Sequence, residues 1–207
     1  YFSVESGWPP ALGASFQKKG SALHKNMGKF FSTGMMASSL LSLLVSRMPN
    51  HENLFLFLIG IGVFAIYMVL SGNRALKYRT KTKPEMIDKT ISGSMFVFSF
   101  IMVALGSYHL TTELDKGILY LLFGGFGLFF TIIDFRFYGN PEKTRSAYSV
   151  SHIRKMVGAF IASVTAFLVA GLGLMNLLFW ILPSVIGTVY IVFWRRKVQG
   201  KTVAGRA

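Results

Sequence analysis

Long apolar runs separated by short polar segments dominate this sequence. The runs cover residues of about 27–46, 53–71, 91–110, 117–135, 153–174 and 176–194. Each run is close to the roughly 20 residues that an α-helix needs to cross the hydrocarbon core of a bilayer. The runs lack the regular alternation of apolar and polar residues that half-buried strands show. The pattern therefore predicts an all-α fold, a polytopic transmembrane helix bundle with six spans.

The composition also indicates a membrane protein. Of the 207 residues, 52% are hydrophobic and 14% are charged, whereas a soluble domain carries about 25% charged residues. The sequence has no cysteine, which excludes disulfides, thiolate metal sites and cysteine nucleophiles. Motifs for a phosphate-binding loop, a zinc peptidase and a serine hydrolase are absent from it. No catalytic residue is therefore predicted.

Lysine and arginine are distributed unevenly between the two ends of the predicted helices. With six spans, 20 of the 22 cations fall on the side that holds both termini, and Arg47 and Lys116 fall on the other. Since cytoplasmic loops carry the excess of Lys and Arg, both termini are expected inside. Topology and attraction to anionic lipid headgroups then explain the net charge of +14, and no nucleic-acid partner is expected.

The chain is expected to form one membrane domain with short polar ends. Residues 1–20 are irregular or part of a truncated helix, residues 21–197 form a single transmembrane helical domain, and residues 198–207 form a basic cytoplasmic tail. The glycine-rich connection 171–176 between the last two helices is expected to be a tight hairpin.

Four histidines fall near predicted helix ends, two on each side of the membrane. His24 and His152 lie on the cytoplasmic side, and His51 and His109 lie on the outer side. This is the distribution of a two-haem transmembrane cytochrome, in which a pair of histidines holds one haem b near each face. The alternative is that all four are ordinary interfacial residues at helix ends. The sequence leaves both interpretations open.

The cytoplasmic pair of histidines is the stronger candidate for a haem or metal site. His24 precedes Gly28, and His152 precedes Met156, by one helical turn, so each pair shares a helix face. Both histidines lie at helix N-termini beside cations, which disfavour the imidazolium form. The neutral imidazole binds a metal or accepts a hydrogen bond. Met156 is either a second soft ligand or a core side chain.

Charged residues at helix ends are expected to join these histidines. Arg74 ends the second predicted helix, and Asp134 and Arg136 end the fourth, so all three arrive on the cytoplasmic side. Ionisable residues at a membrane edge are functional candidates, although an Asp–Arg pair between helix ends is also a routine structural bridge. The predicted ligand-binding residues are His24, Arg74, Asp134, Arg136, His152 and Met156.

Small residues recur every four positions in the fifth predicted helix. They are Gly158, Ala162, Ala166 and Ala170. Such a stripe lets two helices approach closely in lipid. It predicts a helix-packing surface, which serves either this chain or another membrane subunit.

Four segments carry a resemblance to a known family. They are KKGSALHKNMGKFFSTGMMASSLLSLL, FLFLIGIGVFAIYMVLSGNRALK, HIRKMVGAFIASVTAFLV and ILPSVIGTVYIVFW. Together they resemble an uncharacterised bacterial family of predicted membrane proteins, the domain of unknown function numbered twenty-three-oh-six. The similarity runs from about Lys18 to Trp194. It implies a multi-pass protein of the bacterial inner membrane and no settled activity.

The resemblance rests on three short motifs. The residues similar to them are His24 with Gly28, then Arg74, Ala75 and Leu76, then His152 and Met156 followed by Thr165, Ala166 and Phe167. Family members often carry one further helix before the first motif. Residues 1–17 would be a poor version of that helix, and the N-terminus would then lie outside.

Three functions follow from these expectations. The first is a ligand-binding or redox membrane subunit, in which His24 and His152 hold a haem or a quinone headgroup, with Asp134 and Arg74 beside it. The second is a structural accessory subunit that packs against other membrane subunits of a larger complex. The third is a small transporter, for which the sequence offers no inverted repeat.

Overall fold

The fold is all-α, as the apolar runs predict. The computed structural model describes residues 22–45, 52–79, 83–139, 147–174 and 176–204, and it contains no strand within these ranges. The predicted irregular segment 1–20 and His51 lie outside the described residues.

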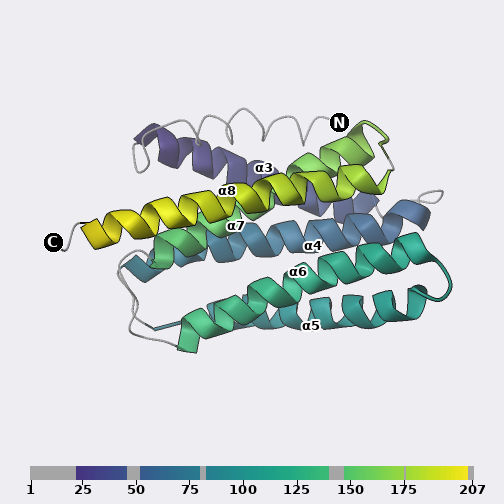
Figure 1. Cartoon of the computed structure of the whole chain (residues 1–207), viewed down its shortest axis with the longest axis horizontal. Coiled ribbons are helices and arrows are strands. Elements are labelled where there is room, and N and C mark those ends of the chain that lie inside the picture. Colours follow the sequence, from purple (N-terminus) through teal and green to yellow (C-terminus); the bar gives the residue numbers. More distant parts are fainter. Residues whose placement is uncertain (1–21, 46–51, 80–82, 140–146, 175, 205–207) are drawn as a thin grey trace. The chain divides into compact units, whose positions relative to one another are not determined.

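Six α-helices correspond one by one to the six apolar runs (Figure 1). They are α3 Ala22–Val45, α4 Glu52–Ala75, α5 Met86–His109, α6 Leu114–Gly139, α7 Ala147–Ala166 and α8 Leu177–Ala204. A 3₁₀ turn, Leu76–Arg79, continues α4, and a π-helical turn, Phe167–Gly171, continues α7. The predicted basic tail begins within a helix, because α8 extends to Ala204.

Four of the described helical stretches are long and apolar enough to cross a membrane. They are Ile59–Tyr78, Met86–His109, Leu114–Gly139 and Ala147–Val169. The apolar part of α8, Leu178–Phe193, is shorter, and α3 carries lysines and several hydroxyl side chains. The chain is therefore a membrane-embedded helical protein, and the count of six spans stays a prediction.

The helices divide between two compact units. The first unit comprises the described residues up to Val69 together with Gly158–Ser184, and the second comprises Leu70–Val157 together with the described part of Val185–Ala207. In the first unit the core contains Phe31 and Met35 of α3, Met68 of α4 and Ala159 of α7, each at most 7% exposed.

The small-residue stripe of α7 packs inside the first unit. A Cβ atom added at Gly158 would lie 3.3 Å from the Sδ atom of Met68. Ala162 is buried and Ala166 is half-buried, while the side chain of Ala170 lies outside the described residues. Gly158 and Ala162 thus pack within this chain, so a partner subunit would need a different surface.

The connection from α7 to α8 is the tight hairpin that the sequence predicts. Gly173 has a φ of 69°, and the backbone N–H of Leu174 donates to the carbonyl of Leu168 over 3.1 Å. A left-handed glycine followed by such a backbone hydrogen bond is a common helix C-terminal motif, in which otherwise unpaired carbonyl groups of the last turn accept hydrogen bonds. The Asn176 side chain then accepts from the N–H of Leu178 over 2.9 Å and starts α8.

In the second unit, α5 and α6 run side by side as a helical hairpin (Figure 1). Glycines let the two helices approach closely. A Cβ atom at Gly124 would lie 2.8 Å from Val103, and one at Gly127 would lie 2.8 Å from Met95. Two glycines of the GGFG segment, Gly124 and Gly127, therefore serve the packing of α6 against α5.

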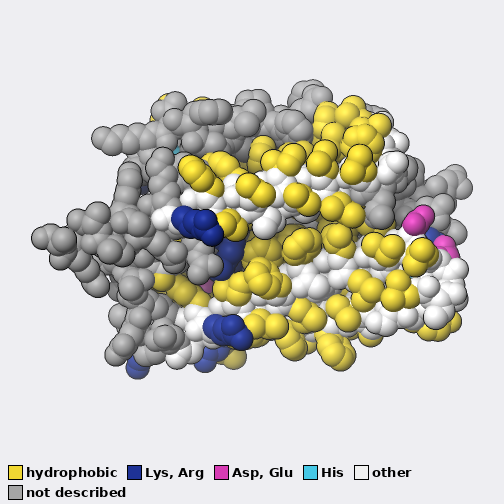
Figure 2. Space-filling model, in the orientation of Figure 1, with side chains coloured by type: hydrophobic (Ala, Val, Ile, Leu, Met, Phe, Trp, Pro, Cys, Tyr) yellow, Lys and Arg dark blue, Asp and Glu magenta, His cyan; other side chains and the backbone are white. Residues whose placement is uncertain are grey.

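The outer surfaces of α5 and α6 are apolar, and the ends of the second unit are charged (Figure 2). Phe100 is 62% exposed and Phe129 is 56% exposed, as expected for side chains that face lipid. Exposed cations, including Lys83 and Lys89, flank the start of α5, whereas Glu113 is exposed in the turn between α5 and α6.

Candidate functional site

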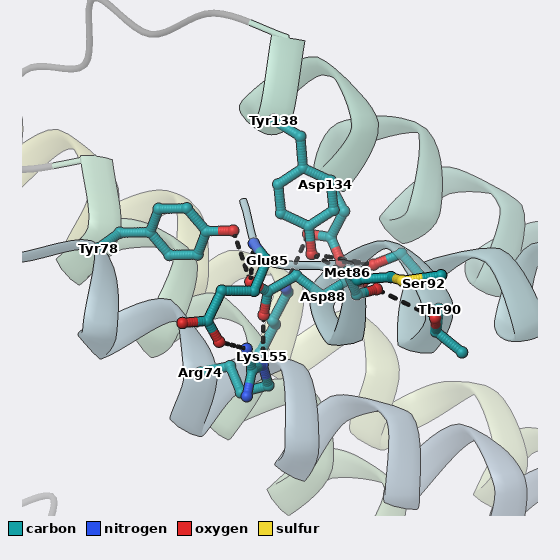
Figure 3. Close-up of polar contacts among 10 residues, drawn as sticks. All are labelled: Arg74, Tyr78, Glu85, Met86, Asp88, Thr90, Ser92, Asp134, Tyr138 and Lys155. Atoms are coloured by element: carbon teal, nitrogen blue, oxygen red, sulfur yellow. Dashed lines mark hydrogen bonds and ion pairs between the residues drawn. The ribbon is translucent and has the colours of Figure 1, made fainter. Parts of the chain in front are cut away.

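In the second unit, a network of polar side chains lies where α4 ends, α5 begins, α6 ends and α7 begins (Figure 3). Two clusters meet there. An Arg74 cluster joins the end of α4 to the start of α5, and a pair formed by Asp134 and Lys155 joins α6 to α7. Each of three helices contributes a charged residue near one of its ends. Arg74 lies at the end of α4, Asp134 lies near the end of α6, and Lys155 lies a few turns after the start of α7.

Arg74 binds two carboxylates of the first turn of α5. Its Nη2 atom lies 2.5 Å from the Oε2 atom of Glu85, and its Nε atom donates to Asp88. Asp88 also accepts from the Tyr78 hydroxyl over 3.0 Å and from the backbone N–H of Glu85 over 2.9 Å. Glu85 and Asp88 form a capping box, so the same carboxylates that cap α5 also hold α4.

Asp134 and Lys155 form an ion pair that is removed from solvent. The Nζ atom of Lys155 lies 2.7 Å from the Oδ1 atom of Asp134, and the two side chains are 3% and 0% exposed. The Ser92 hydroxyl donates to the other carboxylate oxygen over 3.0 Å. A buried pair is costly to desolvate, and apolar side chains of similar volume often stabilise a protein equally well. Stability alone therefore does not explain these charges.

Tyr138 connects the two clusters. Its hydroxyl lies 3.1 Å from the Ser92 hydroxyl and 3.4 Å from the backbone carbonyl of Asp88. Because the Ser92 hydroxyl donates to Asp134, its contact with Tyr138 uses the single Tyr138 proton, which is shared with the more distant carbonyl of Asp88. Tyr138 is half-buried and lies one residue before the last residue of α6. A row of hydroxyls thus leads from the end of α6 to the buried carboxylate.

His152 is fixed against α4 by a hydrogen bond to the backbone. Its Nδ1 atom lies 2.8 Å from the carbonyl oxygen of Gly72. Since a carbonyl oxygen only accepts, Nδ1 carries the proton, and in the neutral imidazole the lone pair lies on Nε2. Histidines that bind metals through one nitrogen commonly hold the other in this way.

Met156 fills the space above Gly72. A Cβ atom at Gly72 would lie 2.5 Å from the methyl group of Met156 and 3.0 Å from Cβ of Lys155. Met156 therefore occupies a packing position on α4, which favours the core alternative for this residue. A haem also takes its axial ligands from opposite faces, whereas His152 and Met156 share one face of α7.

The structure brings together part of the predicted site. Arg74, Asp134, His152 and Met156 belong to the second unit, whereas His24 belongs to the first unit and is half-buried there. The pairing of His24 with His152 stays a prediction. The side chain of Arg136 is exposed. Asp134 forms an ion pair with Lys155, whereas Arg74, the arginine considered for a structural Asp–Arg bridge, binds the carboxylates of Glu85 and Asp88.

Several residues of the site were not predicted. Lys155 is one of the 20 cations that the sequence places on the cytoplasmic side, and Ser92, Asp88 and Glu85 lie before or at the edge of the apolar run that begins at residue 91. The available signal was helical spacing: Asp88 and Ser92, and also Asp134 and Tyr138, are four residues apart and share helix faces. Among the described residues, no group of three or more His, Asp or Glu side chains is placed to hold a metal ion.

Comparison with known proteins adds no relative: no family model, no curated protein and no solved structure matches this chain.

Proposed function

We propose that the protein is a multi-pass protein of the bacterial inner membrane with six spans and both termini in the cytoplasm. The four apolar stretches long enough to cross a membrane support a membrane location. The concentration of cations on the side of the α4–α5 connection supports the orientation, because cytoplasmic loops carry the excess of Lys and Arg. On this topology the Arg74 cluster lies at the cytoplasmic ends of the spans.

Its function, in this proposal, is to bind a polar ligand at the site formed by Asp134, Lys155, Arg74 and His152. The buried Asp134–Lys155 ion pair is the observation that carries the proposal. Charged groups inside membrane helices are expensive and mark binding sites and ion pathways. The hydroxyls of Ser92 and Tyr138 give such a site oriented donors and acceptors.

Native mass spectrometry of the protein purified from its own membrane tests this function. The wild type is expected to retain a non-lipid ligand that the double variant Asp134→Asn/Lys155→Met lacks. The double variant removes both charges together, so it avoids leaving one buried charge unpaired. A matched control, Asp115→Asn/Lys89→Met, changes the same residue types at exposed positions of α6 and α5. Equal ligand retention in wild type and double variant would contradict the proposal.

A haem b held by His152 and His24 is the second candidate, and the His152–Gly72 hydrogen bond favours it. The bond fixes the imidazole with its lone pair on Nε2, the form that binds iron. An absorption spectrum of the same native sample provides the test. Haem absorbance is expected in the wild type and should be lost in both His152→Ala and His24→Ala. A spectrum without haem absorbance rules this candidate out and leaves the polar-ligand site standing.

A further inference from the structure

The outer face of α5 has an open space two turns after the helix begins. Gly93 lies there, and among the described residues no atom lies within 4 Å of a Cβ atom added to it. Residues three and four positions away on a helix border such a space. They are Lys89 and Thr90 toward the helix start and Phe96 and Val97 toward the helix middle, and all four are exposed. The space is therefore open to the surroundings of the protein.

The two borders of this space differ in chemistry. Toward the helix start lie two exposed cations, Lys89 and, three residues before α5, Lys83. Toward the helix middle lie Phe96, Val97 and Phe100, which are 38%, 58% and 62% exposed. Basic side chains likewise border the apolar surface of the second unit in Figure 2. A cationic end that continues into an apolar face is the pattern expected where headgroups meet acyl chains.

The acidic side chains nearby are engaged elsewhere. Glu85 and Asp88 bind Arg74, and Asp88 belongs to the buried face of α5. The Thr90 hydroxyl donates to the backbone carbonyl of Met86 over 3.0 Å, as Figure 3 shows. The side-chain donors at the edge of the open space are therefore ammonium groups, which favour an anion.

We propose that this face of α5 binds one anionic phospholipid. The ammonium groups of Lys83 and Lys89 bind its phosphate, and an acyl chain lies in the open space at Gly93 against Phe96 and Val97. Gly93 lies about 6 Å along the helix axis from Lys89, so one lipid reaches both. Its net negative charge complements the lysines, whereas a phosphatidylethanolamine carries an ammonium group that balances its own phosphate.

This site is separate from the Asp134–Lys155 pair. Ser92, which contacts Asp134, lies on the buried face of α5, and Gly93 lies on the outer face. Lys89 therefore remains a suitable control position for the polar ligand, because retention of that ligand is measured separately from retention of lipids. Failure of the lipid site would leave the proposed function intact, and the reverse also holds.

Native mass spectrometry from vesicles tests the charge selectivity. The vesicles contain equal amounts of phosphatidylglycerol and phosphatidylethanolamine with identical acyl chains. The wild type is expected to retain one phosphatidylglycerol in preference to phosphatidylethanolamine. Lys89→Gln should reduce this preference about fivefold, and Lys83→Gln/Lys89→Gln should reduce it further. The control Arg196→Gln removes an exposed cation near the end of α8 and should retain the preference.

Filling the open space tests the acyl-chain contact without changing any charge. Gly93→Leu should fold as the wild type, because its side chain enters open space, but it should lose the retained phosphatidylglycerol. Gly125→Leu is the matched control, since Gly125 is equally open on α6 and should leave retention unchanged.

Three results would overturn the inference. They are a wild type without preference for phosphatidylglycerol, equal losses in Lys89→Gln and Arg196→Gln, and unchanged retention in Gly93→Leu. Equal losses would show a general attraction of surface charge. A protein that copurifies with the wild type but not with Lys83→Gln/Lys89→Gln, in the absence of any lipid preference, would assign the face to a protein partner instead.

Discussion

Lys155 of α7 and Asp134 of α6 form an ion pair of 2.7 Å in which both side chains are almost fully excluded from solvent. The pair joins two helices of the second unit, and it is linked through Ser92 and Tyr138 to the cluster around Arg74.

The first prediction concerns the cost of breaking the pair. Lys155→Met alone should lower the free energy of unfolding by about 3–5 kcal/mol, because it leaves the Asp134 carboxylate buried without its ammonium. The double variant Asp134→Asn/Lys155→Met should recover most of this loss. Unfolding in mixed detergent micelles measures both, and equal stabilities of the single variant and the wild type would contradict the buried pair.

A second prediction concerns Arg74, whose guanidinium reaches two carboxylates at once. Arg74→Lys keeps the charge but loses the planar arrangement of donors, so we expect a loss of about 1–3 kcal/mol. Arg136→Lys is the control, since Arg136 is exposed on α6, and it should change stability by less than about 0.5 kcal/mol. Similar melting temperatures for the two variants would argue against a stabilising contact of Arg74 with Glu85 and Asp88 between α4 and α5.

The hairpin of α5 and α6 gives a third prediction. Gly124→Ala places a Cβ atom 2.8 Å from Val103, whereas nothing lies within 4 Å of a Cβ atom at the neighbouring Gly125. We therefore expect Gly124→Ala to destabilise the protein by about 1–3 kcal/mol. Gly125→Ala should be neutral or stabilising, because alanine favours the helix. Thermal unfolding in detergent compares the two, and the reverse order of stabilities would contradict the described packing.

The orientation gives a fourth prediction, which the absence of native cysteine makes simple to test. Single cysteines are introduced at Lys83, before α5, and at Glu113, in the turn between α5 and α6. A membrane-impermeant thiol reagent added to intact cells should label Glu113→Cys directly. It should label Lys83→Cys only after the membrane is permeabilised. The opposite pattern would place the α4–α5 connection outside and reverse the proposed topology.

Hydrophobic patterning was sufficient to predict the helices and the charged helix ends. Six apolar runs of about 20 residues leave few alternatives to helices in a bilayer, and all six were found as α-helices. The hairpin around Gly173 could be predicted as well, since its local sequence contains both the left-handed glycine and the Asn176 cap.

The partners within the site could not be predicted from patterning, because they depend on how helices rotate against one another. The sequence predicts Asp134 near an arginine, but the face of α7 that packs here carries Lys155, which forms the ion pair with Asp134. Arg74 instead forms its ion pairs with carboxylates at the start of α5. Helices also begin before their apolar runs: α5 begins at Met86 and not near residue 91, so Asp88 lies outside the predicted span. Capping residues lie outside an apolar run by nature, and a hydropathy criterion therefore misses them.

The proposed site requires that Lys155 and Asp134 remain in contact in a lipid bilayer. Solid-state NMR of protein labelled with ¹⁵N at lysine Nζ and ¹³C at aspartate Cγ measures the dipolar coupling between the two groups. The wild type should show a strong coupling that disappears in Asp134→Asn and persists in Asp115→Asn. No coupling in the wild type, or a coupling that survives Asp134→Asn, would contradict the buried pair and with it the proposed site.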